Sequence, residues 1–109
     1  MVDFIRYNFG KKNTKVIPYP KKFNLKNYMS AAIDKNSGAK ASKTVLNDYI
    51  YDLYAVIVHE GSSTHSGHYY SYVRGFERDN LWYKCNDSIV TKLDGIEAAL
   101  NKQAYILFY

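Results

Sequence analysis

Three consecutive segments decide the fold: residues 49–59 read YIYDLYAVIVH, residues 61–67 read GSSTHSG, and residues 68–74 read HYYSYVR. The first is apolar at its centre, as expected of a strand that is buried on both faces. The second is a loop of small residues, and the third has the composition of another strand. Together they predict two antiparallel strands joined by a short loop.

The chain that follows continues this pattern. Residues 81–85 and 88–91 are expected to be strands, separated by a short polar break at Asn86 and Asp87. Apolar residues at helical spacing predict a helix of about two turns around residues 96–100. Residues 104–109 (AYILFY) predict a last strand. We therefore expect an α+β fold, mainly an antiparallel sheet with one short helix.

The N-terminal part is predicted to be a strand at residues 2–9 that turns through 10–13 into a second strand at 14–17. Prolines at 18 and 20 interrupt strand pairing, and residues 23–29 are expected to be extended. Residues 31–48 are poor in large apolar side chains and rich in Ser, Lys, Ala and Gly, which predicts a disordered insertion. The chain 1–109 is expected to form one domain or part of one.

Composition bounds the class of protein. No window approaches the apolar length of a membrane span, and the first residues lack the apolar run of a signal peptide. The single cysteine, Cys85, cannot form an internal disulfide, which favours a reducing intracellular compartment, cytoplasm or nucleus. The net charge of +5 gathers mainly before residue 41 without interleaved aromatic side chains, so a solvated surface is favoured over a nucleic-acid site.

The chemistry is expected around His68, the first residue of a predicted strand directly after a glycine loop. A sheet would hold its imidazole facing an open cleft, which suits a general base. Asn86 or Asp87 could orient the ring from a neighbouring strand, completing two-thirds of a Cys-His-Asn/Asp triad. From the residues alone, a surface histidine and a simple turn fit the same pattern.

A zinc site is the other chemistry that these residue types suggest. His59, His65, His68 and Cys85 can all ligate zinc. Their places in a strand, a Ser/Gly loop and two further strands do not give the usual ligand spacing, and no Cys-x-x-Cys pair is present. We expect no metal site and no cofactor.

Four motifs in the same order resemble the histidine box of ubiquitin-specific proteases: residues 54–61 (YAVIVHEG), 66–73 (SGHYYSYV), 82–90 (WYKCNDSIV) and 104–109 (AYILFY). The earlier part resembles the family more loosely, at Arg6, at Tyr19-Pro20, at Leu25 and at Tyr28-Met29. The resemblance spans nearly the whole chain except residues 31–48, where the family tolerates insertions.

The resemblance implies the palm part of a papain-like cysteine peptidase that hydrolyses the isopeptide bond after the carboxy-terminal glycine of ubiquitin. His68 matches the general base, Asn86 matches the third triad position, and Asp87 matches the following acidic residue, which can also support the histidine.

The resemblance also implies the site for the substrate. Gly67 would fit the narrow channel for the ubiquitin tail, because a side chain there would obstruct an extended Gly-Gly segment. Ser66 and Tyr69, on either side of Gly67 and His68, are expected to bind the substrate. Residues 60–66 would form a blocking loop over the channel.

The departure from the family is the nucleophile. The family carries it in an upstream box of the Gly-Asn-Thr-Cys-Tyr type, and no such box is in this sequence. Cys85 precedes Asn86 and should point to the other face of its strand, so we interpret it as a packing residue. The isolated chain is expected to be inactive, with an upstream part of the same catalytic domain as its partner.

The expected partners beyond that are ubiquitin and ubiquitinated proteins, with no nucleic acid and no membrane. Two alternatives stay open at this point. One is a non-catalytic ubiquitin-binding fragment of a pseudo-enzyme, and the other is a basic nucleic-acid binder, whose affinity would fall steeply with salt.

Overall fold

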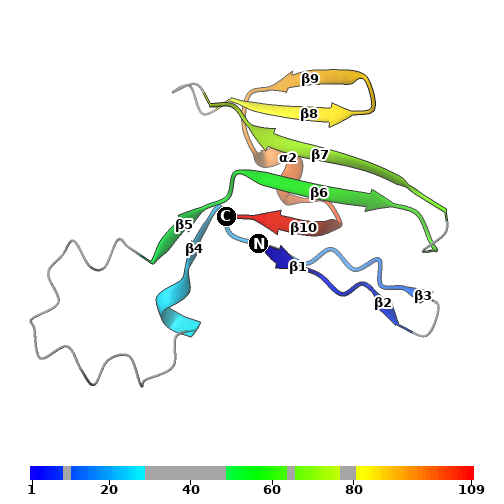
Figure 1. Cartoon of the computed structure of the whole chain (residues 1–109), viewed down its shortest axis with the longest axis horizontal. Coiled ribbons are helices and arrows are strands. Elements are labelled where there is room, and N and C mark those ends of the chain that lie inside the picture. Colours follow the sequence, from blue (N-terminus) through cyan, green and yellow to red (C-terminus); the bar gives the residue numbers. More distant parts are fainter. Residues whose placement is uncertain (9–10, 29–48, 64–65, 77–80) are drawn as a thin grey trace, which may run out of the picture.

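The computed structural model describes residues 1–8, 11–28, 49–63, 66–76 and 81–109. Its main element is a six-stranded sheet in the order β1-β10-β6-β7-β8-β9 (Figure 1). All neighbouring pairs are antiparallel. The strands are β1 Val2–Asp3, β6 Ala55–Glu60, β7 His68–Arg74, β8 Trp82–Asn86, β9 Ile89–Leu93 and β10 Ala104–Phe108. The predicted α+β fold, mainly antiparallel, is confirmed.

Smaller elements flank this sheet. The strands β2 Tyr7–Asn8 and β3 Lys11–Lys12 pair with each other, as do β4 Lys22–Asn24 and β5 Ile50–Asp52. The 3-10 helix η1 (Leu25–Tyr28) follows β4, and the single-turn helix α2 (Glu97–Leu100) precedes β10. The insertion predicted at 31–48 lies outside the described residues. None of the helices in the described part of the chain has the length and apolarity needed to cross a membrane.

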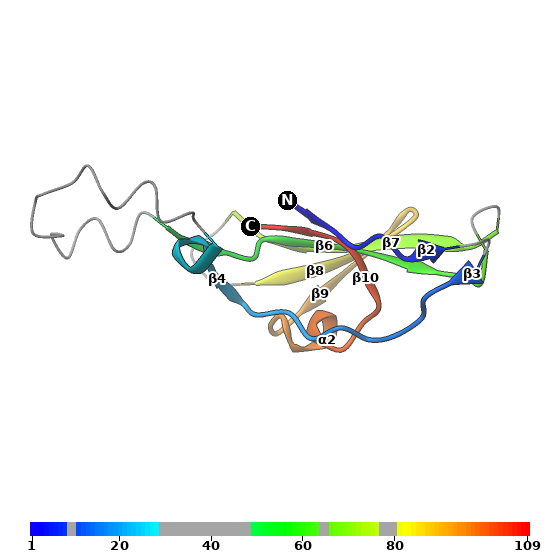
Figure 2. The ribbon, with the colours of Figure 1, turned by 90° about the horizontal axis from the view of Figure 1, so that it is seen from below.

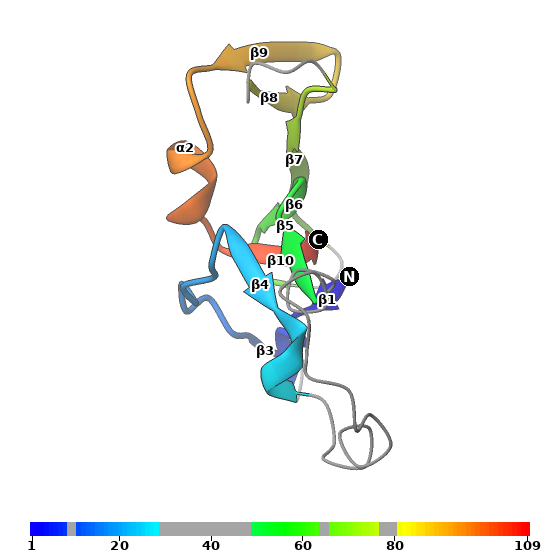
Figure 3. The same ribbon diagram turned by 90° about the vertical axis from the view of Figure 1, so that its left-hand side faces the viewer.

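The core lies on one face of the six-stranded sheet. Because side chains alternate along a strand, every second residue of β6 and β7 points to that face. In β10 an irregularity between Ala104 and Ile106 interrupts the alternation, and Ala104 and Leu107 are the residues that enter the core. The segment that contains Tyr19 and helix α2 lies over it (Figures 2 and 3), and the Tyr19 hydroxyl donates a hydrogen bond of 2.5 Å to the Ala99 carbonyl. The buried apolar side chains are Tyr19, Leu53, Val56, Val58, Tyr70, Tyr72, Trp82, Ile96, Ala99, Ala104 and Leu107.

The single strand predicted at residues 2–9 is wrong, because the chain turns inward at Arg6. Its buried guanidinium donates hydrogen bonds to the carbonyls of Ala104 at 2.6 Å, Asn13 at 2.9 Å and Lys15 at 2.8 Å. These bonds tie both arms of the N-terminal hairpin to the start of β10. The predicted strand therefore splits into β1 and β2, and its partner is at Lys11–Lys12 instead of 14–17.

The continuous strand predicted at residues 49–59 also divides. Leu53 is buried, its N–H bonds the Lys21 carbonyl, and the next N–H, of Tyr54, bonds the Phe108 carbonyl. The chain thus leaves the β4–β5 ladder and joins the main sheet within two residues. The segment 23–29 is extended only to Asn24 before η1 begins. Helix α2 has one turn and not two, and its N-cap, Ile96, provides no side-chain cap.

Candidate active site

His68 and Asn86 come together through the pairing of β7 with β8. The register places Ser71 opposite Cys85, so one step further Asn86 lies beside Tyr70 and diagonal to His68 on the same face of the sheet. The Nε2 atom of His68 is in hydrogen-bond contact with Oδ1 of Asn86. The imidazole is exposed, and Asn86 is half-buried. The strand pairing therefore forms a histidine–asparagine pair open to solvent.

The contact sets the proton positions on the histidine. The Asn86 amide oxygen can only accept a hydrogen bond, so in neutral His68 the Nε2 atom carries the proton and donates a hydrogen bond to that oxygen. The other ring nitrogen, Nδ1, then holds a lone pair and is free to take a proton from a reacting group. A histidine oriented in this way by a side-chain amide has the arrangement that a general base requires.

Asp87 lies in the turn between β8 and β9, where its backbone φ is 51°. Aspartate tolerates this left-handed conformation better than most residues. The side chain is exposed, and of the two candidates for the histidine's partner only Asn86 makes a hydrogen bond to His68. The structure thus brings Asn86 to His68 and leaves Asp87 one residue further along the turn.

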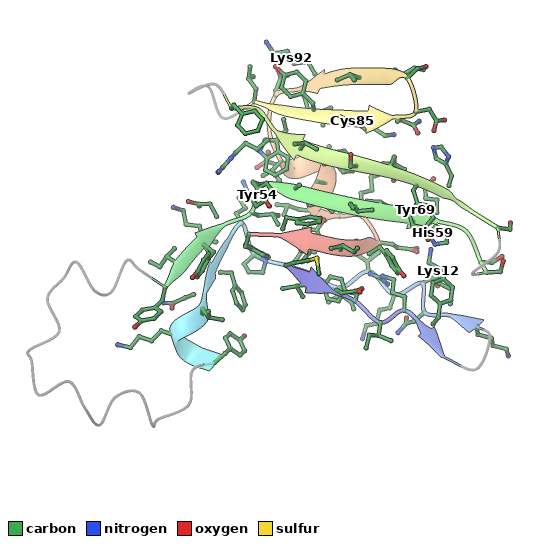
Figure 4. The ribbon with its side chains drawn as sticks, viewed as in Figure 1. Lys12, Tyr54, His59, Tyr69, Cys85 and Lys92 are labelled. Carbon is green, nitrogen blue, oxygen red and sulfur yellow. The ribbon has the colours of Figure 1, made fainter. Side chains whose placement is uncertain are left out.

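The three residues predicted to bind the substrate all adjoin His68. Ser66 and Gly67 are exposed at the end of the loop that leads into β7. Tyr69 is 51% exposed. It points to the opposite face of β7 from His68, and its ring lies 4.3 Å from that of His59 (Figure 4). Ser66 and Gly67 therefore precede His68 in the chain, while Tyr69 belongs to the far side of the strand.

A polar cluster that sequence reasoning missed lies beside His68. Glu60 pairs with His68 across the β6–β7 ladder, and its Oε1 accepts a hydrogen bond of 2.6 Å from the Tyr70 hydroxyl. Burial, together with this bond to Glu60, raises the pKa of Tyr70, which keeps the hydroxyl protonated as a donor. The Lys84 ammonium lies 4.5 Å above the Tyr70 ring. The alternation of β7 puts Tyr70 on the side of His68, which is the signal that could have found it.

Cys85 and His59 point away from the pair. Cys85 alternates with Asn86 on β8 and is half-buried on the other face (Figure 4). His59 pairs with Tyr69 and is therefore also on the face opposite His68. His65 lies outside the described residues, and no group of three metal-ligating side chains occurs within the parts of the chain that the structure describes.

The family model for ubiquitin carboxyl-terminal hydrolase matches residues 2–109. The chain is 42% identical over 100 residues to the human "inactive ubiquitin carboxyl-terminal hydrolase 17-like protein 7". It is 41% identical over 100 residues to the mouse "ubiquitin carboxyl-terminal hydrolase 17-like protein C". Each alignment covers 92% of this chain and 16% of the relative, so the chain spans about a sixth of the length of these proteins.

Solved structures agree with this assignment. The chain is similar to part of the SAGA Ubp8/Sgf11/Sus1/Sgf73 DUB module bound to ubiquitin aldehyde, with a TM-score of 0.67 and 31% identity over 91% of this chain and 20% of that one. A variant of the module bound to monoubiquitin gives a TM-score of 0.68 and 29% identity over 91% and 19%. By sequence and by fold, the chain belongs to the ubiquitin carboxyl-terminal hydrolase family.

Proposed function

We propose that this chain supplies a general base, His68, and its orienting partner, Asn86, to a cysteine peptidase that hydrolyses the isopeptide bond after the carboxy-terminal glycine of ubiquitin. The observation that carries the proposal is the hydrogen-bond contact between His68 Nε2 and Asn86 Oδ1. The nucleophile would come from another part of the same catalytic domain, because Cys85, the one cysteine of the sequence, lies on the other face of β8.

In this mechanism, Nδ1 of His68 takes the proton of the incoming thiol, and the thiolate attacks the carbonyl carbon of the last ubiquitin glycine. The imidazolium then gives that proton to the departing lysine amine, leaving a thioester. His68 next takes a proton from water, which hydrolyses the thioester and frees the thiol. The Oδ1 atom of Asn86 accepts a hydrogen bond from Nε2–H throughout and keeps the ring from turning.

The substrate would be an extended tail that passes Ser66 and Gly67 on its way to His68. Both residues are exposed and immediately precede the histidine in the chain. Tyr69 would contribute from the face of β7 opposite His68, where about half of its surface is open. A reducing compartment such as cytoplasm or nucleus would keep the thiol nucleophile active. Ubiquitin is supported as partner by the similar module, which is described bound to ubiquitin aldehyde.

A second candidate function is ubiquitin binding without cleavage. The observation that favours it is the name of the human relative, which is called inactive although it is 42% identical to this chain. A pseudo-enzyme of this kind would keep the ubiquitin-facing surface and would lack a reactive thiol.

The test uses the longest natural polypeptide that carries this chain. It is mixed with ubiquitin joined through an isopeptide bond to a fluorescent lysine peptide, and both binding and release of the peptide are measured. The proposal predicts release, retained in a Cys85→Ser variant and absent from a variant that lacks the upstream cysteine. Binding without release supports the pseudo-enzyme, and activity lost in Cys85→Ser would overturn the assignment of the nucleophile.

A further inference from the structure

His59 is buried to 1% exposure, an unusual place for an imidazole that the proposed reaction does not use. It is the second-to-last residue of β6, and it pairs with Tyr69 across the ladder. Figure 4 shows it close to Tyr69 and Lys12 at the end of the sheet where β7 begins. A buried polar ring at this place requires partners, and they come from three separate segments.

One edge of the ring takes part in a short chain of hydrogen bonds. The Tyr7 hydroxyl lies 2.9 Å from His59 Nδ1 and donates to the Ser63 carbonyl at 3.1 Å. The phenol has one proton, and the Ser63 oxygen can only accept, so His59 Nδ1–H donates to the phenol oxygen. Burial first, and then the Lys12 charge, lower the pKa of His59, which favours the neutral ring that this chain of bonds requires.

The other edge of the ring lies against the loop that enters β7. A Cβ atom added to Gly67 would meet His59 Nε2 at 2.1 Å and the Glu60 carbonyl oxygen at 2.8 Å. A Cβ on Gly61 would meet the Gly67 Cα at 2.7 Å. The backbone of Gly67 therefore packs directly on the imidazole, one residue before His68, with no room for a side chain.

We propose that His59 is a positioning residue for His68. Its ring, anchored through Tyr7 to Ser63, forms a fixed surface on which Gly67 rests, and this sets the point at which β7 begins. The inference rests on the proposed role of His68. The contact with the His59 ring also explains why residue 67 is glycine, independently of any obstruction of the ubiquitin tail.

The first test removes one oxygen atom. Tyr7→Phe breaks the link between His59 and Ser63 and keeps the aromatic ring, whereas Tyr105→Phe removes a hydroxyl from the same aromatic cluster that makes no hydrogen bond to His59. In the longer polypeptide, nuclear Overhauser contacts between the His68 ring and the Asn86 side chain are measured. They should weaken in Tyr7→Phe and persist in Tyr105→Phe. Unchanged contacts in Tyr7→Phe would overturn the proposal.

The same two variants are then compared in the longer polypeptide for cleavage of ubiquitin conjugates. Tyr7→Phe should lower kcat about tenfold, as the loss of one hydrogen bond allows, and leave KM within about twofold. Tyr105→Phe should match the wild type in both. A rise in KM alone would show that the cluster serves ubiquitin binding and not the placement of His68.

The second test asks why residue 67 is glycine. Gly67→Ala, His59→Ala and the double variant form a cycle in kcat. If the His59 ring is what excludes a side chain, its removal makes room, and the double variant should be at least about threefold more active than the product of the two single losses predicts. Recovery should be incomplete, since the Glu60 carbonyl also lies close. Strictly multiplicative losses would contradict the proposal.

The two proposals fail in different ways. Full activity in His68→Ala would refute the proposed function. The nuclear Overhauser contacts between His68 and Asn86, which do not depend on activity, would still report whether His59 places the His68 ring. If His68→Ala abolishes activity as the proposed function predicts, but Tyr7→Phe has no effect, only the positioning role of His59 would be refuted.

Discussion

The two faces of the β6–β7 pair carry one histidine each, in opposite surroundings. His68 is exposed and bonded to Asn86, whereas His59 is buried against Gly67 and bonded to Tyr7. Neighbouring positions of the same ladder separate them, because Glu60 pairs with His68 and His59 with Tyr69. Of these two histidines, only the exposed His68 is accessible to a substrate. The buried His59 can affect His68 only through the backbone of Gly67, which packs on its ring.

The largest effect is expected on the exposed side. His68→Ala in the longer polypeptide should lower kcat for ubiquitin conjugates about 10²- to 10⁴-fold, the usual contribution of a general base. The thermal midpoint should change little, because the imidazole is exposed. Lys92→Ala, an exposed change on β9, is the matched control. Activity within about twofold of the wild type would remove His68 from the mechanism.

The second-largest effect is expected at Asn86 and Asp87, the two candidate partners of His68. Asn86→Ala removes the acceptor that orients the His68 ring. It should lower kcat about tenfold, which corresponds to the loss of one hydrogen bond. Asp87→Ala should cost less, because its carboxylate makes no hydrogen bond to His68 in the described structure. Steady-state kinetics of the two variants decide between them, and a larger loss in Asp87→Ala would reverse the assignment.

A smaller effect is expected from Tyr70, which lies on the side of His68. Tyr70→Phe removes the hydrogen bond to Glu60 and should lower the free energy of unfolding by about 1 kcal/mol. Tyr54→Phe is a suitable control, because Tyr54 is 45% exposed and contacts Phe108 through its ring. Urea unfolding measures both variants, and equal stabilities would show that the bond to Glu60 contributes nothing.

The smallest effect concerns the buried side and its pH dependence. The pKa of His59 is lower in the folded state than in the unfolded chain, because burial disfavours the charged ring. The unfolded chain therefore binds a proton first as pH falls below about 6.5, and His59 makes the fold less stable in that range. Thermal midpoints at several pH values should show this loss in the wild type and less of it in His59→Asn. An identical pH profile in the variant would contradict the burial of a neutral ring.

Sequence reasoning recovered the parts of the molecule in which alternation decides the structure. Strand β7 was predicted with its observed bounds, because its side chains alternate across a half-buried sheet. Strands β8 and β10 were predicted to within one residue. Of the candidates that the sequence offers for the site, the structure brings His68 and Asn86 into hydrogen-bond contact. The choice between Asn86 and Asp87 was left open, since it depends on the turn that begins at the positive φ of Asp87.

The parts that were missed depend on contacts between distant segments. Arg6 splits the first strand by bonding carbonyls as far away as Ala104, and Leu53 divides the strand predicted at 49–59 by packing into the core. The contact of His59 with Gly67 and Tyr7 joins three segments, and no spacing in the sequence reveals it. The alternation and spacing of residues within one segment do not predict contacts between distant segments.

The most direct test of the central claim is a double-mutant cycle on His68 and Asn86 in the longer polypeptide, measured as kcat for cleavage of a ubiquitin isopeptide conjugate. If Asn86 acts by orienting His68, Asn86→Ala should cost about tenfold in the wild type and nothing further once His68 is alanine. The same tenfold loss in both backgrounds would show that the two residues act independently, and would contradict the histidine–asparagine pair as the unit that this chain contributes.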